Sequence, residues 1–209
     1  MLSRRTVISS VLAAPFMKTS EAATQVLGLP TPYGQPLRAW VTSPEIIKQD
    51  CPYWCWAAAA AMIFTRLGHP IKQQTITDRA VSGGCLTAPN TAFIAHMLND
   101  QWTDLKGQSF QSQITAAYDP ANGINAINVP IIVNHLANNK PLMYCNHSHA
   151  MVMVVADYFS TPMGPKNIFG AAVLDPAVGI PDWRPLSNSE VTPAHVGGSM
   201  TFLATVNVF

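Results

Sequence analysis

Cys55 places a thiol at the start of an apolar segment that is well suited to form a buried helix. No charged residue occurs from Cys51 to Thr65, and Gly68 and Pro70 then supply a stop. The N-terminus of a helix carries unpaired N–H groups and about half a positive charge, which favours an anion held there. We therefore expect Cys55 to be biased toward the thiolate, the nucleophilic form of cysteine.

Two histidines in the later part of the chain are candidates for the base that would activate this thiol. His147 and His149 are two residues apart, but only His149 directly precedes the apolar run AMVMVV, which predicts a buried strand. A histidine that begins a buried strand is held rigidly at the rim of a cleft. We therefore predict that His149 forms a thiolate–imidazolium pair with Cys55.

A carboxylate and an amide complete the predicted set. Asp175 follows an apolar run that ends at Leu174, so it would lie at a strand end and could orient the imidazole. Asp157 and Asp182 are alternatives for that role. Gln49, six residues before Cys55, could donate its side-chain amide to an oxyanion, beside the backbone N–H of Cys55. Together these residue types indicate covalent chemistry at a carbonyl carbon.

The elements that must hold these residues change in character along the chain. In the first two thirds the pattern predicts helices over residues 55–67, 73–81, 90–100 and 129–139. Residues 24–48 are predicted to be extended with one short strand, and residues 101–128 are polar and turn-rich.

Strands dominate from Pro141 onward. They are predicted over residues 141–146, 150–159, 167–175 and 199–209. The middle two are expected to form an antiparallel hairpin with a long loop over residues 160–167. This order predicts an α+β fold in which a helical N-terminal half and an antiparallel C-terminal sheet meet along a cleft.

Size and composition fit a single domain over residues 24–209. The chain has 209 residues, of which 48% are hydrophobic and only 11% charged, with a net charge of +1. This composition is enough for one substantial core and offers no basic surface for nucleic acid. We expect a monomer that has no membrane association after signal removal and needs no cofactor.

The first 23 residues are predicted to be an export signal. Arg4 and Arg5 precede an apolar run from Val7 to Met17, and small residues follow at Ala22 and Ala23. The paired arginines resemble a twin-arginine signal, although a general secretory signal would look similar. We therefore expect an exported protein, periplasmic or secreted, in a compartment that permits disulfides.

The segment CNHSH admits a second interpretation, in which Cys145, His147 and His149 alternate along a strand as zinc or copper ligands. That interpretation leaves the segment from Gln49 to Trp56 without a function and offers no obvious fourth ligand for the metal ion. The sequence therefore favours no metal and predicts Cys145 to be a buried apolar side chain.

The segment from Gln49 to Ala57, with Cys51 between Gln49 and Cys55, resembles the active-site signature of papain-like cysteine proteases. The segments WCWAAAAAMI and KQQTITDRAVSGGC look most similar to the compact effector-type proteases of bacterial plant pathogens. The bacteriocin-processing peptidases resemble this sequence more distantly. The resemblance covers most of the chain from Gln49 to about Pro176.

The resemblance implies a catalytic set and a polypeptide substrate. Cys55 would be the nucleophile, His149 the general base and acid, Asp175 the orienter and Gln49 the oxyanion donor. Papain itself has asparagine where Asp175 stands here. The same chemistry would serve an amidase, an acyltransferase or a deamidase, and an inactive binding module is a further alternative.

The resemblance also bears on residues around the catalytic set. It implies a disulfide between Cys51 and Cys85, and it makes Trp56, Gly83 and Gly84 candidates for substrate binding. Pro52, Tyr53 and Trp54 replace the small residues found between papain's two cysteines, so the substrate pockets themselves do not transfer.

Overall fold

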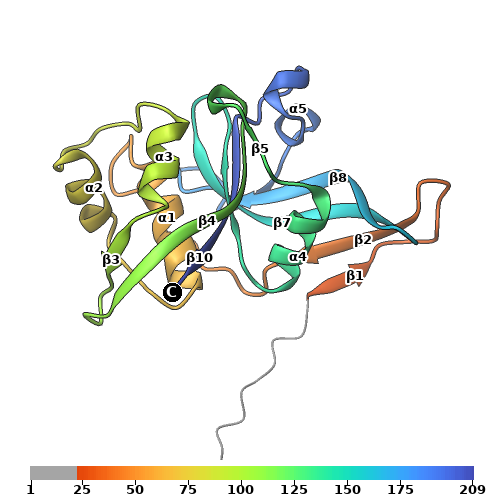
Figure 1. Ribbon diagram of the computed structural model, residues 1–209, viewed down its shortest axis with the longest axis horizontal. Helices are drawn as coiled ribbons and strands as arrows, with labels where there is room; N and C mark the ends of the chain where they lie inside the picture. The colour runs from red at the N-terminus through yellow and green to blue at the C-terminus, as the bar shows by residue number, and fades with distance from the viewer. Residues whose placement is uncertain (1–22) are drawn as a thin grey trace, which may run out of the picture.

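An antiparallel sheet organises residues 23–209, the part of the chain that the computed structural model describes (Figure 1). Its long path runs in the order β1-β2-β7-β6-β10-β4-β3, with β8 on β7, β9 on β8 and β5 on β4. The strands are β1 (Thr24–Val26), β2 (Gln35–Trp40), β3 (Gln101–Thr103), β4 (Ser109–Asp119), β5 (Ile124–Asn125), β6 (Leu142–Cys145), β7 (Ala150–Thr161), β8 (Gly164–Leu174), β9 (Trp183–Pro185) and β10 (Phe202–Val208).

Helices α1, α2 and α3 gather at one end of the molecule, and the β7–β8 hairpin extends with β1 and β2 at the other (Figure 1). The α-helices are α1 (Cys55–Arg66), α2 (Gln73–Val81), α3 (Thr91–Met97), α4 (Val129–Ala137) and α5 (Asn188–Val191). Two short 3₁₀ turns cover Pro120–Asn122 and Ala194–Val196. The predicted α+β class is confirmed, and the four predicted helices are present.

Helix α1 is the buried helix that its composition predicts. Every residue from Trp56 to Phe64 is buried, and the helix packs against β6, β7 and α2. Trp54 stands at the N-cap position without a side-chain hydrogen bond to the helix. The first N–H groups of α1 therefore have no side-chain cap, and they remain available to an anion held at Cys55.

Local caps explain where α3 and α4 begin and where α2 ends; α3 and α4 end before the predicted residues 100 and 139. The side chain of Asn90 accepts a hydrogen bond from the N–H of Phe93 at 2.9 Å, which caps α3. Asn128 caps α4 in the same way through Ile131. Helix α2 ends at Ser82, which adopts a left-handed conformation with φ 57°.

Three details of the predicted strands were wrong. Residues 101–128 contain β4, an eleven-residue strand that pairs with β10 deep in the sheet, because alternate positions such as Phe110 and Ser112 are buried while the positions between them are polar and exposed. Residues 24–48 contain two strands, β1 and β2, rather than one. The β7–β8 hairpin has no long loop, since Thr161 pairs directly with Gly164 across a two-residue turn.

The sheet topology brings three distant segments together. Strands β6 and β7 are joined by a short turn over residues 146–149, and the pairing of Val152 with Leu174 sets the end of β8 beside the start of β7. Helix α1 packs on the same strand, β7. The head of α1, the β6–β7 turn and the end of β8 thus carry Cys55, His149 and Asp175, respectively.

The predicted export signal lies almost entirely outside the described residues, which begin at Ala23. Within residues 23–209, no helix is both long enough and apolar enough to span a membrane.

Candidate active site

Cys55 is the first residue of α1, and its side chain is partly exposed. Burial alone would raise the pKa of this thiol, but a hydrogen bond from His149 and the N–H groups of Ala150 and Trp56 lower it below the ordinary cysteine value. The predicted bias toward thiolate is thus built from one imidazole and two backbone donors.

His149 is held by the turn that precedes β7. The side-chain oxygen of Asn146 accepts the N–H groups of Ser148 and His149 at 3.1 and 2.9 Å, and the N–H of Asn146 donates to the carbonyl of His149 at 3.0 Å. The imidazole Nε2 lies 2.6 Å from Oδ1 of Asp175, which leaves Nδ1 for the thiol of Cys55. Both ring nitrogens therefore have a partner that fixes the orientation of the ring.

Burial would lower the pKa of His149, yet hydrogen bonds to Asp175 and Cys55 raise it to about 9. The raised pKa of the imidazole and the lowered pKa of the thiol act in the same direction. Both shifts favour the ion pair, in which the proton resides on His149 and the negative charge on Cys55.

Asp175 directly follows β8, as its place in the sequence indicates, and its side chain is only 2% exposed. Burial would raise its pKa, but hydrogen bonds from His149, from the N–H of Ala177 at 3.0 Å and from Nε of Arg184 at 3.1 Å lower it to about 2. The carboxylate is thus ionised and has a donor on each oxygen.

The alternative candidates lie elsewhere. Asp157 is paired with Arg38 at 2.6 Å, and Asp182 with Lys48 at 2.9 Å, so neither is the carboxylate on His149. His147 is exposed on the turn.

Two of the three residues of the alternative metal site are held in other ways. Cys145 is buried in β6, where burial raises its pKa, while His149 is bonded to Asp175. Among residues 23–209, no group of three or more His, Cys, Asp or Glu side chains lies close enough to hold a metal ion.

Gln49 lies on a segment that is bound to the loop after Asp175. Its N–H donates to the carbonyl of Pro176 at 2.9 Å, and its side-chain Nε2 donates to the carbonyl of Pro52 at 2.7 Å. An amide NH₂ has two hydrogens, so one of them remains for another acceptor. The Oε1 atom is buried and has no hydrogen-bond partner among the described residues.

Lys48 strengthens this connection between the two segments. Its ammonium group donates to three backbone carbonyls of the loop after β8, at Asp175 (3.1 Å), Ala177 (2.9 Å) and Ile180 (3.2 Å). The segment that carries Gln49 and the loop that begins at Asp175 are therefore held as one unit. The sequence offered no signal for this role of Lys48.

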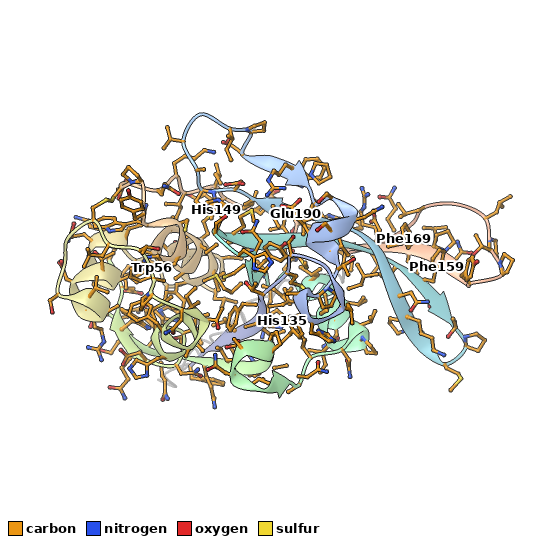
Figure 2. All side chains as sticks on the ribbon, turned by 90° about the horizontal axis from the view of Figure 1, so that it is seen from above. Trp56, His135, His149, Phe159, Phe169 and Glu190 are labelled. Carbon is orange, nitrogen blue, oxygen red and sulfur yellow. A yellow bond between two sulfur atoms is a disulfide. The ribbon has the colours of Figure 1, made fainter. Side chains whose placement is uncertain are left out.

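A cavity of about 340 Å³ opens beside the thiol and the imidazole. Trp56 lines one wall, and its indole N–H donates to the carbonyl of Leu86 at 3.2 Å. Gly83 and Gly84 are not among the lining residues, which include Cys55, residues 87–91, residues 145–150 and Thr201. Figure 2 shows Trp56 on one side of His149 in that view.

Cys51 and Cys85 form a disulfide, which confirms the predicted pairing and leaves Cys55 and Cys145 as free thiols among the described residues. The bond connects the segment before α1 to the loop after α2. The indole N–H of Trp54 donates to the carbonyl of Gly84 at 3.0 Å across the same contact. The start of α1 is thereby fastened to the loop that leads into the cavity wall.

Arg184, like Lys48, is a residue near this site that the sequence did not indicate. It lies on β9, donates to Asp175 and forms a bidentate pair with Glu190. No motif marks it, because its position beside Asp175 depends on the pairing of β8 with β9.

This fold, with a cysteine heading the central helix opposite a histidine from the sheet, is that of the papain-like cysteine protease clan. Within that clan, the chain belongs to the Peptidase_C39 like family, whose model matches residues 36–166. The resemblance to papain-like proteases is thus confirmed, while the nearer likeness to effector-type proteases stays a prediction. The matched segment ends before Asp175, so the position of this carboxylate is known from the structure alone.

Among solved structures, one described as the crystal structure of UfSP from C. elegans is similar at 15% sequence identity, with a TM-score of 0.46. The similarity covers 86% of this chain and 35% of that one, so this chain spans about a third of the length of that protein. A search of curated proteins found no match.

Proposed function

We propose that this protein is an exported cysteine peptidase that hydrolyses peptide bonds through an acyl-enzyme on Cys55. The observation that carries the proposal is the arrangement around His149, whose ring lies between the thiol at the head of α1 and the buried carboxylate of Asp175. Membership of a peptidase family supports the same reaction.

The proposed reaction proceeds in two halves. The Cys55 thiolate attacks the peptide carbonyl carbon, and the carbonyl π electrons move to oxygen, where the N–H of Cys55 and the amide of Gln49 would stabilise the oxyanion. The tetrahedral intermediate collapses as the C–N bond breaks, and His149 gives its proton to the leaving amine. Neutral His149 then takes a proton from water, whose oxygen attacks the thioester carbonyl carbon. The C–S bond breaks, which releases the carboxylic acid and restores the Cys55 thiolate beside protonated His149.

Asp175 keeps the imidazole in one orientation throughout both halves and stabilises its charged form. Because the pKa of Asp175 is about 2 and that of His149 about 9, the carboxylate and the imidazolium are both charged between those two pH values.

Export is the second part of the proposal. The disulfide between Cys51 and Cys85 supports an oxidising compartment, and the basic, apolar and small residues over residues 1–23 supply the signal.

Labelling with an epoxide that traps thiols, followed by peptide mass mapping, tests the site. We expect a single adduct on Cys55 in the native protein and a much slower reaction in His149→Ala. Cys145→Ser is the matched control, because Cys145 is buried and should not contribute. An adduct that forms on Cys55 equally fast in His149→Ala would contradict the proposed pair.

Product analysis separates the reactions that share this acyl-enzyme. Incubation with a peptide library should release new N-termini that depend on Cys55. Conversion of glutamine to glutamate without cleavage, or transfer of the acyl group to an added amine, would replace the peptidase proposal with deamidation or acyl transfer. A Cys55 that labels readily without any product would indicate an inactive binding module.

A further inference from the structure

The guanidinium group of Arg184 joins two carboxylates. Its Nε donates to Oδ2 of Asp175 at 3.1 Å, while its two terminal nitrogens donate to the carboxylate of Glu190 at 2.8 and 3.1 Å. The hydrogen bond to Glu190 is the leading reason why the pKa of Arg184 is raised and that of Glu190 is lowered to about 2. A row of alternating charge therefore runs from Cys55 through His149, Asp175 and Arg184 to Glu190.

Backbone structure holds both Arg184 and Glu190 in place. The pairing of Val173 with Arg184 puts the guanidinium at the end of β8, where Asp175 begins the next loop. Glu190 completes a capping box with Ser187, which ties its carboxylate to the first turn of α5. In addition, the hydroxyl of Tyr144 donates to the carbonyl of Glu190 at 2.9 Å. Figure 2 shows Glu190 on the side of His149 opposite to Trp56.

The two oxygens of Asp175 have different partners as a result. Oδ1 accepts from His149 and from the N–H of Ala177, and Oδ2 accepts from Arg184. A carboxylate that is bonded on one oxygen only can rotate about its Cβ–Cγ bond, whereas one that is bonded on both has a fixed plane.

We propose that Arg184, clamped by Glu190, is a positioning residue that fixes the carboxylate plane of Asp175 so that Oδ1 is presented to His149. This inference rests on the proposed function, because it concerns the orientation of the same imidazole. Arg184 does not touch the thiol, and its effect passes through Asp175.

Arginine suits this role better than lysine. The planar guanidinium group donates to the carboxylates of Asp175 and Glu190 through separate N–H groups. Its positive charge offsets one of their two negative charges. Lys48, the other cation near Asp175, donates to its backbone carbonyl and pairs with Asp182, so it cannot replace Arg184 at the side chain.

A double-mutant cycle between Arg184 and Asp175 tests the proposal. The measurement is the rate of Cys55 alkylation by chloroacetamide at neutral pH, which reports the thiolate without requiring peptide turnover. We expect Arg184→Met to slow alkylation roughly tenfold in the native background and less than about twofold in the Asp175→Ala background. Arg184→Lys should slow alkylation less than Arg184→Met does, because lysine keeps the positive charge but lacks the planar set of N–H donors.

A matched control is available on the same sheet. Arg38 makes an equivalent pair with Asp157 toward the far end of β7, and Arg38→Met should leave the alkylation rate unchanged. Because Arg184→Met leaves the partly buried carboxylate of Glu190 without a cation, the double variant Arg184→Met/Glu190→Gln provides a form without that uncompensated charge, and it should show the same kinetic loss.

Equal slowing by Arg184→Met in both backgrounds would overturn the inference, as would no slowing in the native background. These results are distinct from failure of the proposed function itself. If His149→Ala and Asp175→Ala both alkylate at the native rate, the catalytic set is wrong. If they are slow while Arg184→Met is not, only the role of Arg184 is wrong.

Discussion

Nε2 of His149 lies 2.6 Å from Oδ1 of Asp175, although 26 residues separate them in the chain. The hairpin of β7 and β8 accounts for this proximity, because His149 immediately precedes the first strand and Asp175 immediately follows the second. Any change that shifts the register of this hairpin would separate the two residues.

Substitutions of Asp175 should have graded effects. Asp175→Asn keeps an oxygen that can accept from His149, but its NH₂ group would face Nε of Arg184, donor against donor. We expect kcat/KM to fall by roughly 10-fold in Asp175→Asn and by roughly 10²- to 10³-fold in Asp175→Ala. Turnover of a fluorogenic peptide measures both. Equal losses in the two variants would assign the orienting role to another residue.

The alkaline limit of activity should reflect His149, whose pKa is about 9. Since this pKa is raised above the ordinary value, the ion pair stabilises the fold fully below about pH 6.5, and that stabilisation is lost as pH rises through about 9. We expect kcat/KM to decline above about pH 9. In Asp175→Ala the decline should begin at lower pH, because the strongest favourable partner of the imidazolium is gone. A pH profile in which both proteins share one alkaline limit would contradict this assignment.

The disulfide should stabilise the fold without taking part in the reaction. Cys51 and Cys85 are 34 residues apart, and a loop of this size corresponds to a loss of about 3 to 4 kcal/mol when the bond is absent. We expect Cys51→Ser/Cys85→Ser to unfold at a lower temperature, with Cys55 still reactive at low temperature. Thermal denaturation monitored by circular dichroism measures the first effect. An unchanged unfolding temperature would show that the bond does not constrain the chain.

His135 should make the protein less stable in mild acid. Burial lowers its pKa from 6.5 to about 4, with a further contribution from Lys140, and its Nε2 is buried without a hydrogen-bond partner among the described residues (Figure 2). The folded state therefore keeps His135 neutral, so stability is lost as pH falls from about 6.5 through about 4.

His135→Leu removes this titration. The free energy of unfolding, measured by urea titration at a series of pH values, should fall less steeply between pH 6.5 and 4 in the variant than in the native protein, by an amount on the order of 3 kcal/mol over that interval. Identical slopes in the two proteins would show that the pKa of His135 is the same in the folded and unfolded states.

Local patterns were sufficient to predict most elements that hold the site. The apolar segment after Cys55 has the length and composition of a core helix, and the strand after His149 is apolar at nearly every position, so both were placed correctly. The choice of Asp175 was also supported, because an apolar strand ending in aspartate puts a carboxylate at a sheet end.

What the sequence did not predict depends on contacts between distant residues. Strand β4 was missed because polar side chains occupy its exposed positions and hide the alternation of buried residues such as Phe110 and Ser112. Arg184 and Lys48 were missed because their contacts depend on tertiary structure. Arg184 reaches Asp175 through the pairing of β8 with β9, and Lys48 binds carbonyls of the loop after β8. Neither position carries a local signal that distinguishes it from an ordinary surface charge.

The pH dependence of Cys55 alkylation in the native protein and in His149→Ala tests most directly whether the thiol and the imidazole form an ion pair. The native thiol should react rapidly at pH values below its ordinary pKa of 9.0, because His149 and the head of α1 stabilise the thiolate. In His149→Ala, rapid reaction should require a pH close to that ordinary value. Superimposable profiles from the two proteins would show that Cys55 is not activated by His149, and the proposed catalytic set would then be incorrect.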